Sequence, residues 1–198
     1  GSSVFMWEQI AHLGHTIIPP VPSLFTFNIK DPRIKDLMGL SVPNAEVQIK
    51  ALKAKNHGPL LITHWGMSGP GILKTSAVKA RELYNLNYQF EIKVNWIMEK
   101  EQDVIEHLNT QKKKEPKRKI HNTAQYQVPK RLWQSLCLHC DINEELRWAD
   151  LNKKQMNKLC TELCAGIYKV KGKSTFKEEF VTAGGVQLKE VDFKTYES

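Results

Sequence analysis

Small and apolar residues occupy every second position in several short segments of the chain, and this period predicts half-buried strands. The pattern is clearest over residues 45–52 and 88–96. Residues 60–62 are apolar throughout, which is typical of a more deeply buried strand. A turn at residues 56–58 would join the strands 45–52 and 60–62 into a hairpin.

Other segments carry the longer period of a helix or the composition of an additional strand. Helices are predicted over residues 4–13, 70–84, 103–108, 129–140 and 151–167, with a helical turn over residues 31–39. Further strands are predicted at residues 16–18, 24–29, 168–170 and 180–182. The prolines at 19, 20 and 22 cannot donate to a sheet and mark a stiff connection or an edge.

The order of these elements is β-rich, then helical, then β-rich again. We therefore expect an α+β fold, a β-barrel-like or mixed-sheet unit with an inserted small helical subdomain. Residues 15–97 and 166–182 would form the β-rich unit, and residues 98–165 the helical subdomain.

Composition is that of a globular protein, with 41% hydrophobic and 25% charged residues. No apolar run reaches the roughly 18 residues of a membrane span. The first residues do not resemble a signal peptide, so we expect a cytoplasmic protein that has no membrane partner.

The net charge of +8 raises the question of a nucleic-acid partner. Much of this charge lies in residues 112–119, which hold six basic side chains and one glutamate. Such a run is usually a solvated loop, and no aromatic residues are interleaved with it for base stacking. A nucleic-acid-binding module that uses this basic loop is therefore the alternative function rather than the leading one.

Four cysteines have a spacing that resembles a metal site, Cys137-x-x-Cys140 and Cys160-x-x-x-Cys164. Each pair also falls on the apolar stripe of a predicted helix. Because free cysteine behaves as a small buried hydrophobe, core packing is favoured over metal binding, and we assign no metal site.

The segment 63–70 predicts a buried strand that enters a tight turn and then a helix, with Ser68 as the helix cap and Pro70 in the first turn. A helix N-terminus favours anions, so a carboxylate or phosphate could bind here. A hydrolase nucleophile elbow needs glycine at position 70 and is excluded. His64 could act as an acid or base near neutral pH, although a lone histidine is more often structural.

The segment 181–186 predicts a strand that leads into a Gly184-Gly185 turn, where backbone can approach a ligand closely. No G-x-G-x-x-G follows any predicted strand, so the chain has no dinucleotide fingerprint of its own.

Four ordered blocks of the sequence resemble the BaiN/YhiN-like FAD-dependent oxidoreductases, the aminoacetone oxidase family of flavoproteins. The blocks are IAxLGHTI (10–17), PSLFTF (22–27), LITHWGMSGP (61–70) and FVTAGGV (180–186), the last continuing through residues 189–198. The resemblance spans nearly the whole chain but corresponds to the middle, inserted portion of such a protein.

The resemblance implies a β-barrel-like insert with a helical subdomain, carried without the Rossmann-type FAD domain that such an enzyme needs. Residues 1–14 would belong to that parent domain, and residues 183–198 would lead back to it. FAD would bind the parent protein and not this fragment, which we expect to be inactive alone. The implied partners are the missing FAD domain, a small organic substrate and NAD(P)H.

The resemblance also suggests where such a site would lie. The candidates for the substrate pocket are Phe25, Phe27, His64, Trp65 and Ser68. The candidates for approaching FAD in the parent are Thr182, Ala183, Gly184, Gly185 and Val186. The catalytic residues are not identified.

Overall fold

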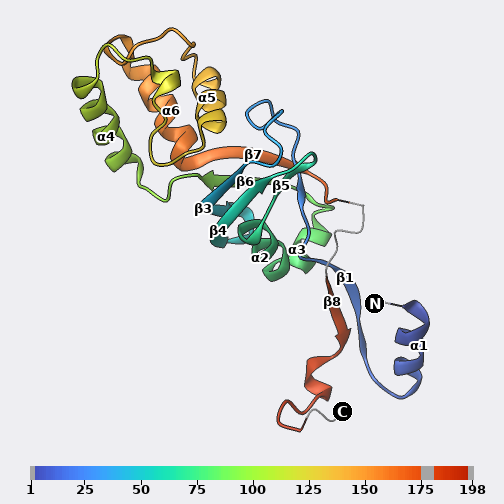
Figure 1. Cartoon of the computed structure of the whole chain (residues 1–198). Coiled ribbons are helices and arrows are strands. Elements are labelled where there is room, and N and C mark those ends of the chain that lie inside the picture. Colours follow the sequence, from blue (N-terminus) through green and yellow to red (C-terminus); the bar gives the residue numbers. More distant parts are fainter. Residues whose placement is uncertain (1–2, 175–180, 196–198) are drawn as a thin grey trace.

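A six-stranded antiparallel sheet forms the centre of the molecule (Figure 1). The computed structural model of the chain describes residues 3–174 and 181–195. The strands lie in the order β2-β5-β4-β3-β6-β7. Their bounds are β2 (Phe27–Asn28), β3 (Ser41–Ile49), β4 (Ala54–Ile62), β5 (Gly66–Ser68), β6 (Gln89–Asn95) and β7 (Gly166–Lys171).

The sheet curls until its two outer strands meet. Phe27 in β2 forms an antiparallel bridge with Lys173, just beyond β7. The N–H of Asn28 donates to the carbonyl of Gly172 at 2.9 Å. These bonds occupy edges that an open sheet would leave unpaired. The result is a nearly closed, barrel-like sheet, and the predicted α+β fold is confirmed.

The predicted hairpin is present, but its turn lies elsewhere. The strand β4 runs straight through residues 56–58, with Asn56 opposite Val47 in β3. The chain reverses instead at the 3₁₀ turn η1 (Lys50–Leu52) and at Lys53, which has a left-handed φ of 49°.

Two helices pack against the barrel where one was predicted. The segment 70–84 is divided at Lys79 into α2 (Pro70–Val78) and α3 (Ala80–Asn85). Lys79 has a φ of −119°, outside the helical range, and it forms an ion pair with Glu82 at 2.8 Å.

Three helices form a separate unit between β6 and β7. They are α4 (Glu101–Lys114), α5 (Lys130–His139) and α6 (Lys153–Ala165), with the 3₁₀ turns η2 (Ile120–Asn122) and η3 (Trp148–Asp150) between them. Asn152 and Gln155 form a capping box at the start of α6. All three helices were predicted, although α4 extends further and includes the first half of the basic segment.

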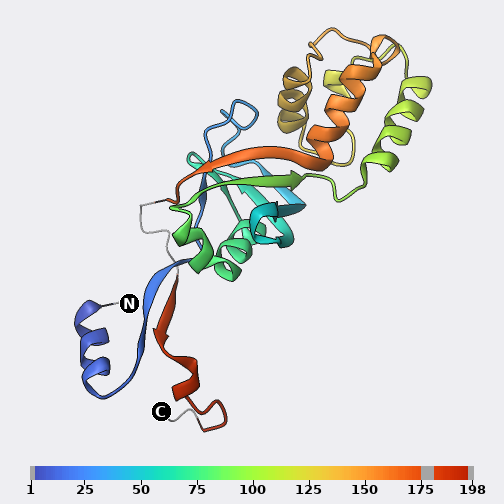
Figure 2. The ribbon, with the colours of Figure 1, turned by 180° about the vertical axis from the view of Figure 1, so that it is seen from behind.

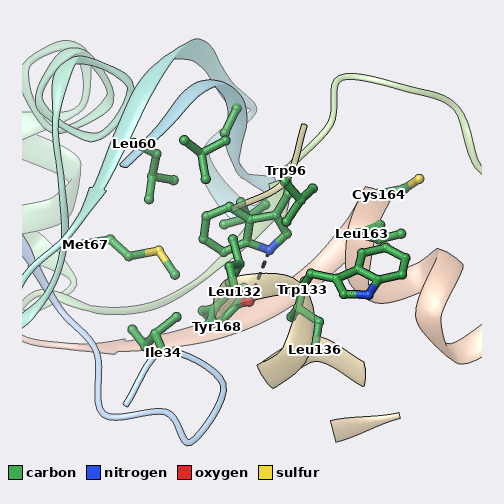
Figure 3. Close-up of a cluster of buried hydrophobic side chains, with 14 of the residues drawn as sticks. Ile34, Leu60, Met67, Trp96, Leu132, Trp133, Leu136, Leu163, Cys164 and Tyr168 are labelled. Carbon is green, nitrogen blue, oxygen red and sulfur yellow. Dashed lines mark hydrogen bonds between the residues drawn. The ribbon is translucent and has the colours of Figure 1, made fainter. Parts of the chain in front are cut away.

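One continuous hydrophobic core joins the barrel to the three helices. Figure 3 shows part of this core, in which Trp96 at the end of β6 lies between barrel residues such as Leu60 and helix residues such as Leu163. The indole N–H of Trp96 donates to the hydroxyl of Tyr168 in β7 at 3.2 Å. The helical unit is therefore packed firmly on the barrel.

A two-stranded ribbon extends from the opposite end of the barrel (Figures 1 and 2). It pairs β1 (Ile17–Ser23) with β8 (Val181–Val186) in antiparallel fashion, next to α1 (Val4–His12) and the 3₁₀ turn η4 (Leu188–Glu190). The prolines of β1 therefore lie in an edge strand, as expected.

Three sequence predictions in this region need correction. Of the predicted strand 24–29, only Phe27–Asn28 is a strand, because Leu24 has a left-handed φ of 55°. Residues 31–39 form successive turns rather than the single helical turn that was predicted. Gly184 and Gly185 lie within β8 rather than in a turn, and Phe180 lies outside the described residues.

Over residues 3–174 and 181–195, no helix has both the length and the apolar character needed to cross a bilayer.

Candidate functional site

The turn between β4 and β5 has the tight geometry that its sequence indicates. The hydroxyl of Thr63 accepts from the N–H of Trp65 at 3.3 Å and of Gly66 at 3.2 Å. Gly66 has a φ of 150°, and a Cβ there would lie 2.3 Å from the carbonyl oxygen of Phe27. Only glycine therefore allows β2 to approach β5 this closely.

Ser68 does not cap the following helix, so this prediction is wrong. The N-cap of α2 is Gly69, and it makes no side-chain capping bond. Ser68 belongs to β5, where its hydroxyl accepts from that of Thr26 at 2.9 Å. The strand β5 was not predicted: residues 66–68 pair with β4 and β2, where a turn was expected.

The turn exposes His64 and Trp65 beside a surface cavity. The side chain of Trp65 is 51% exposed, and His64 lines the cavity. The cavity has a volume of about 550 Å³, and its other walls come from Thr63 and from the loop that spans residues 29–38. This volume lies within the range of about 300–1,000 Å³ that is usual for small-ligand sites.

Phe25 and Phe27 lie elsewhere, fully buried in the barrel core. Phe25 packs edge-to-face on Tyr88 at 5.3 Å between ring centroids, and Phe27 packs likewise on Phe90 at 5.1 Å. The structure thus brings His64 and Trp65 together but separates them from the two phenylalanines. A substrate role for any of these residues stays a prediction.

Arg33 lies in the loop 29–38 and binds it to α6 through a buried ion pair. Its role was not predicted from the sequence. Its guanidinium binds the carboxylate of Asp31 at 2.7 Å and that of Glu162 in α6 at 2.6 Å. It also lies 3.8 Å from the ring centre of Tyr168. The signal that could have located it is the Asp31-x-Arg33 spacing in a loop, but its partner Glu162 is 129 residues away in the sequence.

The charges of this cluster hold one another in the ionised state. Burial opposes the charged form of Arg33, but its bonds to Asp31 and Glu162 outweigh burial and raise the pKa of the guanidinium. Burial likewise acts to raise the pKa of Asp31, and its hydrogen bonds with Arg33 reverse the effect, so the pKa of this carboxyl is lowered.

Two side chains of α5 form hydrogen bonds with backbone carbonyls of the same loop. The hydroxyl of Ser135 donates to the carbonyl of Arg33 at 2.7 Å, and the guanidinium of Arg131 donates to the carbonyl of Asp36. The cavity wall is therefore fixed by both the barrel and the helical unit.

The four cysteines are buried in the hydrophobic core of the helical unit. Burial raises the pKa of the Cys140 thiol to about 12, and burial also raises the pKa of Cys137. Within the described residues, no group of three histidine, cysteine or acidic side chains could hold a metal ion. The structure thus agrees with core packing of these thiols.

The basic segment 112–119 is an ordered part of the helical unit. The backbone N–H of Ile120 donates to the carbonyl of Leu146 at 3.0 Å, and the backbone N–H of Trp148 donates to the carbonyl of Arg118 at 3.0 Å. The indole N–H of Trp133, in α5, donates to the carbonyl of Ile120 at 2.8 Å. The cations are thus carried on a fixed backbone rather than on a loose loop.

Several of these cations remain available to an external partner. Arg118 pairs with Glu115 and Lys119 pairs with Glu145. Among the residues that the structure describes, Lys113, Lys114 and Lys117 are exposed and form no ion pair.

The five candidates for approaching FAD, Thr182 to Val186, all lie in β8. A Cβ at Gly184 would lie 2.8 Å from the carbonyl oxygens of Ile18 and Pro19 in β1, and one at Gly185 would lie 3.4 Å from the ring of Trp7. Close packing on β1 therefore accounts for Gly184, and the positive φ of 122° favours glycine at position 185.

Comparison with known proteins places this geometry in a family. The sequence model described as "HI0933-like protein barrel and H2TH domain" matches residues 21–181. A protein of Haemophilus influenzae named ribosomal RNA dihydrouridine synthase is 29% identical over 202 aligned positions, covering all of this chain and 47% of that protein. A protein of the same name from Escherichia coli is 25% identical over 202 positions, with the same coverage.

The chain spans about half the length of the curated relatives it matches. The family match covers the barrel and the helical unit, and it agrees with the resemblance carried by the four sequence blocks. The chain therefore belongs to the family of the HI0933-like barrel and H2TH domain, which is that of the BaiN/YhiN-like flavoproteins.

Proposed function

We propose that this chain is the RNA-binding portion of an FAD-dependent oxidoreductase that reduces a uridine of ribosomal RNA. The observation that carries the proposal is the match of the whole chain to two proteins named ribosomal RNA dihydrouridine synthase. The resemblance to the flavoproteins implied a small organic substrate with NAD(P)H. We propose RNA as the substrate instead of a small organic molecule, because both relatives are named for ribosomal RNA.

Reduction of uridine adds a hydride and a proton across the C5–C6 double bond of the base. In the whole protein, FAD that has first been reduced by NAD(P)H would supply the hydride, a proton would come from an acid or from water, and the protein would bind and orient the base. We assign the redox step to the FAD-binding part of the whole protein and not to this chain. Its part is to bind the RNA.

The fixed basic segment supports this division of roles. Lys113, Lys114 and Lys117 are exposed side chains without ion pairs among the described residues, so they can neutralise phosphates. The buried tryptophans 133 and 148 hold the neighbouring backbone in place. A preformed cationic surface loses less conformational entropy on binding than a loose loop does.

The RNA-binding role is tested with the triple variant K113Q/K114Q/K117Q. We expect it to bind a labelled ribosomal RNA fragment at least about tenfold more weakly than the unsubstituted chain, because each phosphate contact contributes to affinity. A matched control removes three lysines elsewhere (K53Q/K74Q/K169Q). Equal weakening in both variants would mean that overall charge, and not this segment, binds the RNA.

The flavin assignment is tested by visible absorbance of the purified chain before and after adding FAD. We expect no flavin spectrum to remain after gel filtration, because the family resemblance implies that FAD binds the Rossmann-type domain of the parent protein. Retained flavin, or sustained oxidation of NAD(P)H by this chain alone, would contradict the assignment of FAD to another part of the protein.

A further inference from the structure

The cavity beside His64 is separate from the basic segment used above. It is bounded by the loop 29–38 and the turn at Thr63 and His64, and its volume is about 550 Å³. In Figures 1 and 2 this loop lies next to α5, at the end of the barrel away from the ribbon of β1 and β8. It is therefore also distinct from the residues proposed to approach FAD.

The backbone around the cavity is fixed without a ligand. The N–H of Ile29 donates to the carbonyl of Trp65 at 2.8 Å, and the N–H of Gly39 donates to that of Ile62 at 2.9 Å. The two ends of the loop are thus tied to the β4–β5 turn. The buried cluster of Arg33 and the bonds from α5 hold its middle.

The cavity combines cations with apolar surface. Lys30 and Lys35 are exposed lining residues, and His64 of the β4–β5 turn also lines the cavity. Of the two acidic lining residues, Asp31 directs both carboxylate oxygens to Arg33, which leaves Asp36 at the rim. The apolar lining includes Met38, whose side chain is 52% exposed.

This arrangement fits a phosphate joined to a flat base. Lysine ammonium groups bind phosphate oxygens, and unpaired bases stack on flat or soft side chains while their edges form hydrogen bonds. The carboxylate of Asp36 is the acceptor that the rim offers to a base N–H.

We propose that this cavity binds one unpaired nucleotide of the RNA, with its phosphate on Lys30 and Lys35 and its base against Met38 and His64. This inference rests on the proposed function. Because the cavity lies away from β8, the nucleotide held here flanks the reduced uridine rather than being it.

One helix connects this cavity to the basic segment. Arg131 and Ser135 of α5 hold the cavity loop, and Trp133 of the same helix holds the backbone that follows the basic segment. Both surfaces are thus positioned by α5. We expect a single RNA to contact both of them, with its register fixed by the nucleotide in the cavity.

The test uses the full chain and a fluorescein-labelled RNA hairpin with an unpaired loop, followed by fluorescence anisotropy. We expect K30Q/K35Q to weaken binding at least about fivefold and to lower the salt slope by about 1. The charge-matched control K74Q/K169Q should bind as the unsubstituted chain does. H64A should weaken binding to the hairpin but not to a blunt duplex of the same length.

NMR spectra then test whether the RNA contacts the residues of the cavity. Adding the hairpin should shift amide resonances of residues 29–38 and 63–66 in nitrogen–proton NMR spectra, and adding uridine 5′-monophosphate alone should shift a subset of them. If K30Q/K35Q binds as tightly as the control and these resonances do not move, the cavity assignment is wrong while RNA binding by the chain stands. If the unsubstituted chain binds no RNA, the proposed function fails first.

Discussion

Arg33 joins the barrel to the helical unit through charges that are almost completely withdrawn from water. Its side chain is 7% exposed, and those of Asp31 and Glu162 are 17% and 13% exposed. Removing one member of such a cluster leaves the others charged, buried and unpaired. The cluster therefore governs both the stability of the fold and the position of the cavity loop.

We expect R33M to lower the free energy of unfolding by about 3–5 kcal/mol, measured by urea denaturation. The matched control is R118A, which removes a surface ion pair of a side chain that is 60% exposed. We expect R118A to lower the free energy of unfolding by less than about 1 kcal/mol. Equal losses in the two variants would show that the buried cluster contributes no more than a surface pair.

The lowered pKa of Asp31 predicts how stability depends on pH. The ordinary value of this carboxyl is 3.8, and the folded value lies below it. The stabilisation is therefore fully present above the unfolded pKa and is lost as pH falls through the folded pKa. Urea midpoints should fall between about pH 5 and pH 2 in the unsubstituted chain and fall less in D31N. The same decline in both proteins would contradict the assignment.

At the scale of elements, periodicity predicted most of the helices and strands but not how they are joined. Asn56, His57 and Gly58 have turn-like composition, yet β4 continues through them because a partner strand lies opposite. Gly58 has a φ of 150° and lies against the start of α2, where a Cβ would be 3.4 Å from the backbone nitrogen of Gly71. Such an approach between distant residues has no local signal.

Gly66 gives the sharpest test of the barrel closure. We expect G66A to destabilise the fold by more than about 2 kcal/mol, because its methyl group would overlap the backbone of β2. Gly39 is the control: its φ is 80°, but nothing lies within 4 Å of an added Cβ. G39A should cost only about 1 kcal/mol of backbone strain. If thermal unfolding shows that G66A and G39A lose similar amounts of stability, β2 does not pack against β5 as described.

At the scale of the whole molecule, the sequence predicted the order of barrel, helical unit and return strand. It did not predict the cavity, because the loop 29–38 is brought to the turn at His64 by barrel closure and to Glu162 by the docking of α6. It placed Phe25 and Phe27 with His64 as pocket candidates, although both rings are fully buried in the core. Local patterns thus identified the elements, and long-range packing determined the site.

The most direct test of the account is the salt dependence of RNA binding by the unsubstituted chain. The three lysines of the basic segment, with one phosphate each, and the phosphate shared by Lys30 and Lys35 give four phosphate contacts. We therefore predict that log Kd rises with log salt with a slope of roughly 3, since each contact on single-stranded RNA contributes about 0.7. A measured slope near this value would support an RNA-binding surface that uses both regions. Absent binding, or binding that does not change between about 50 and 200 mM salt, would contradict it.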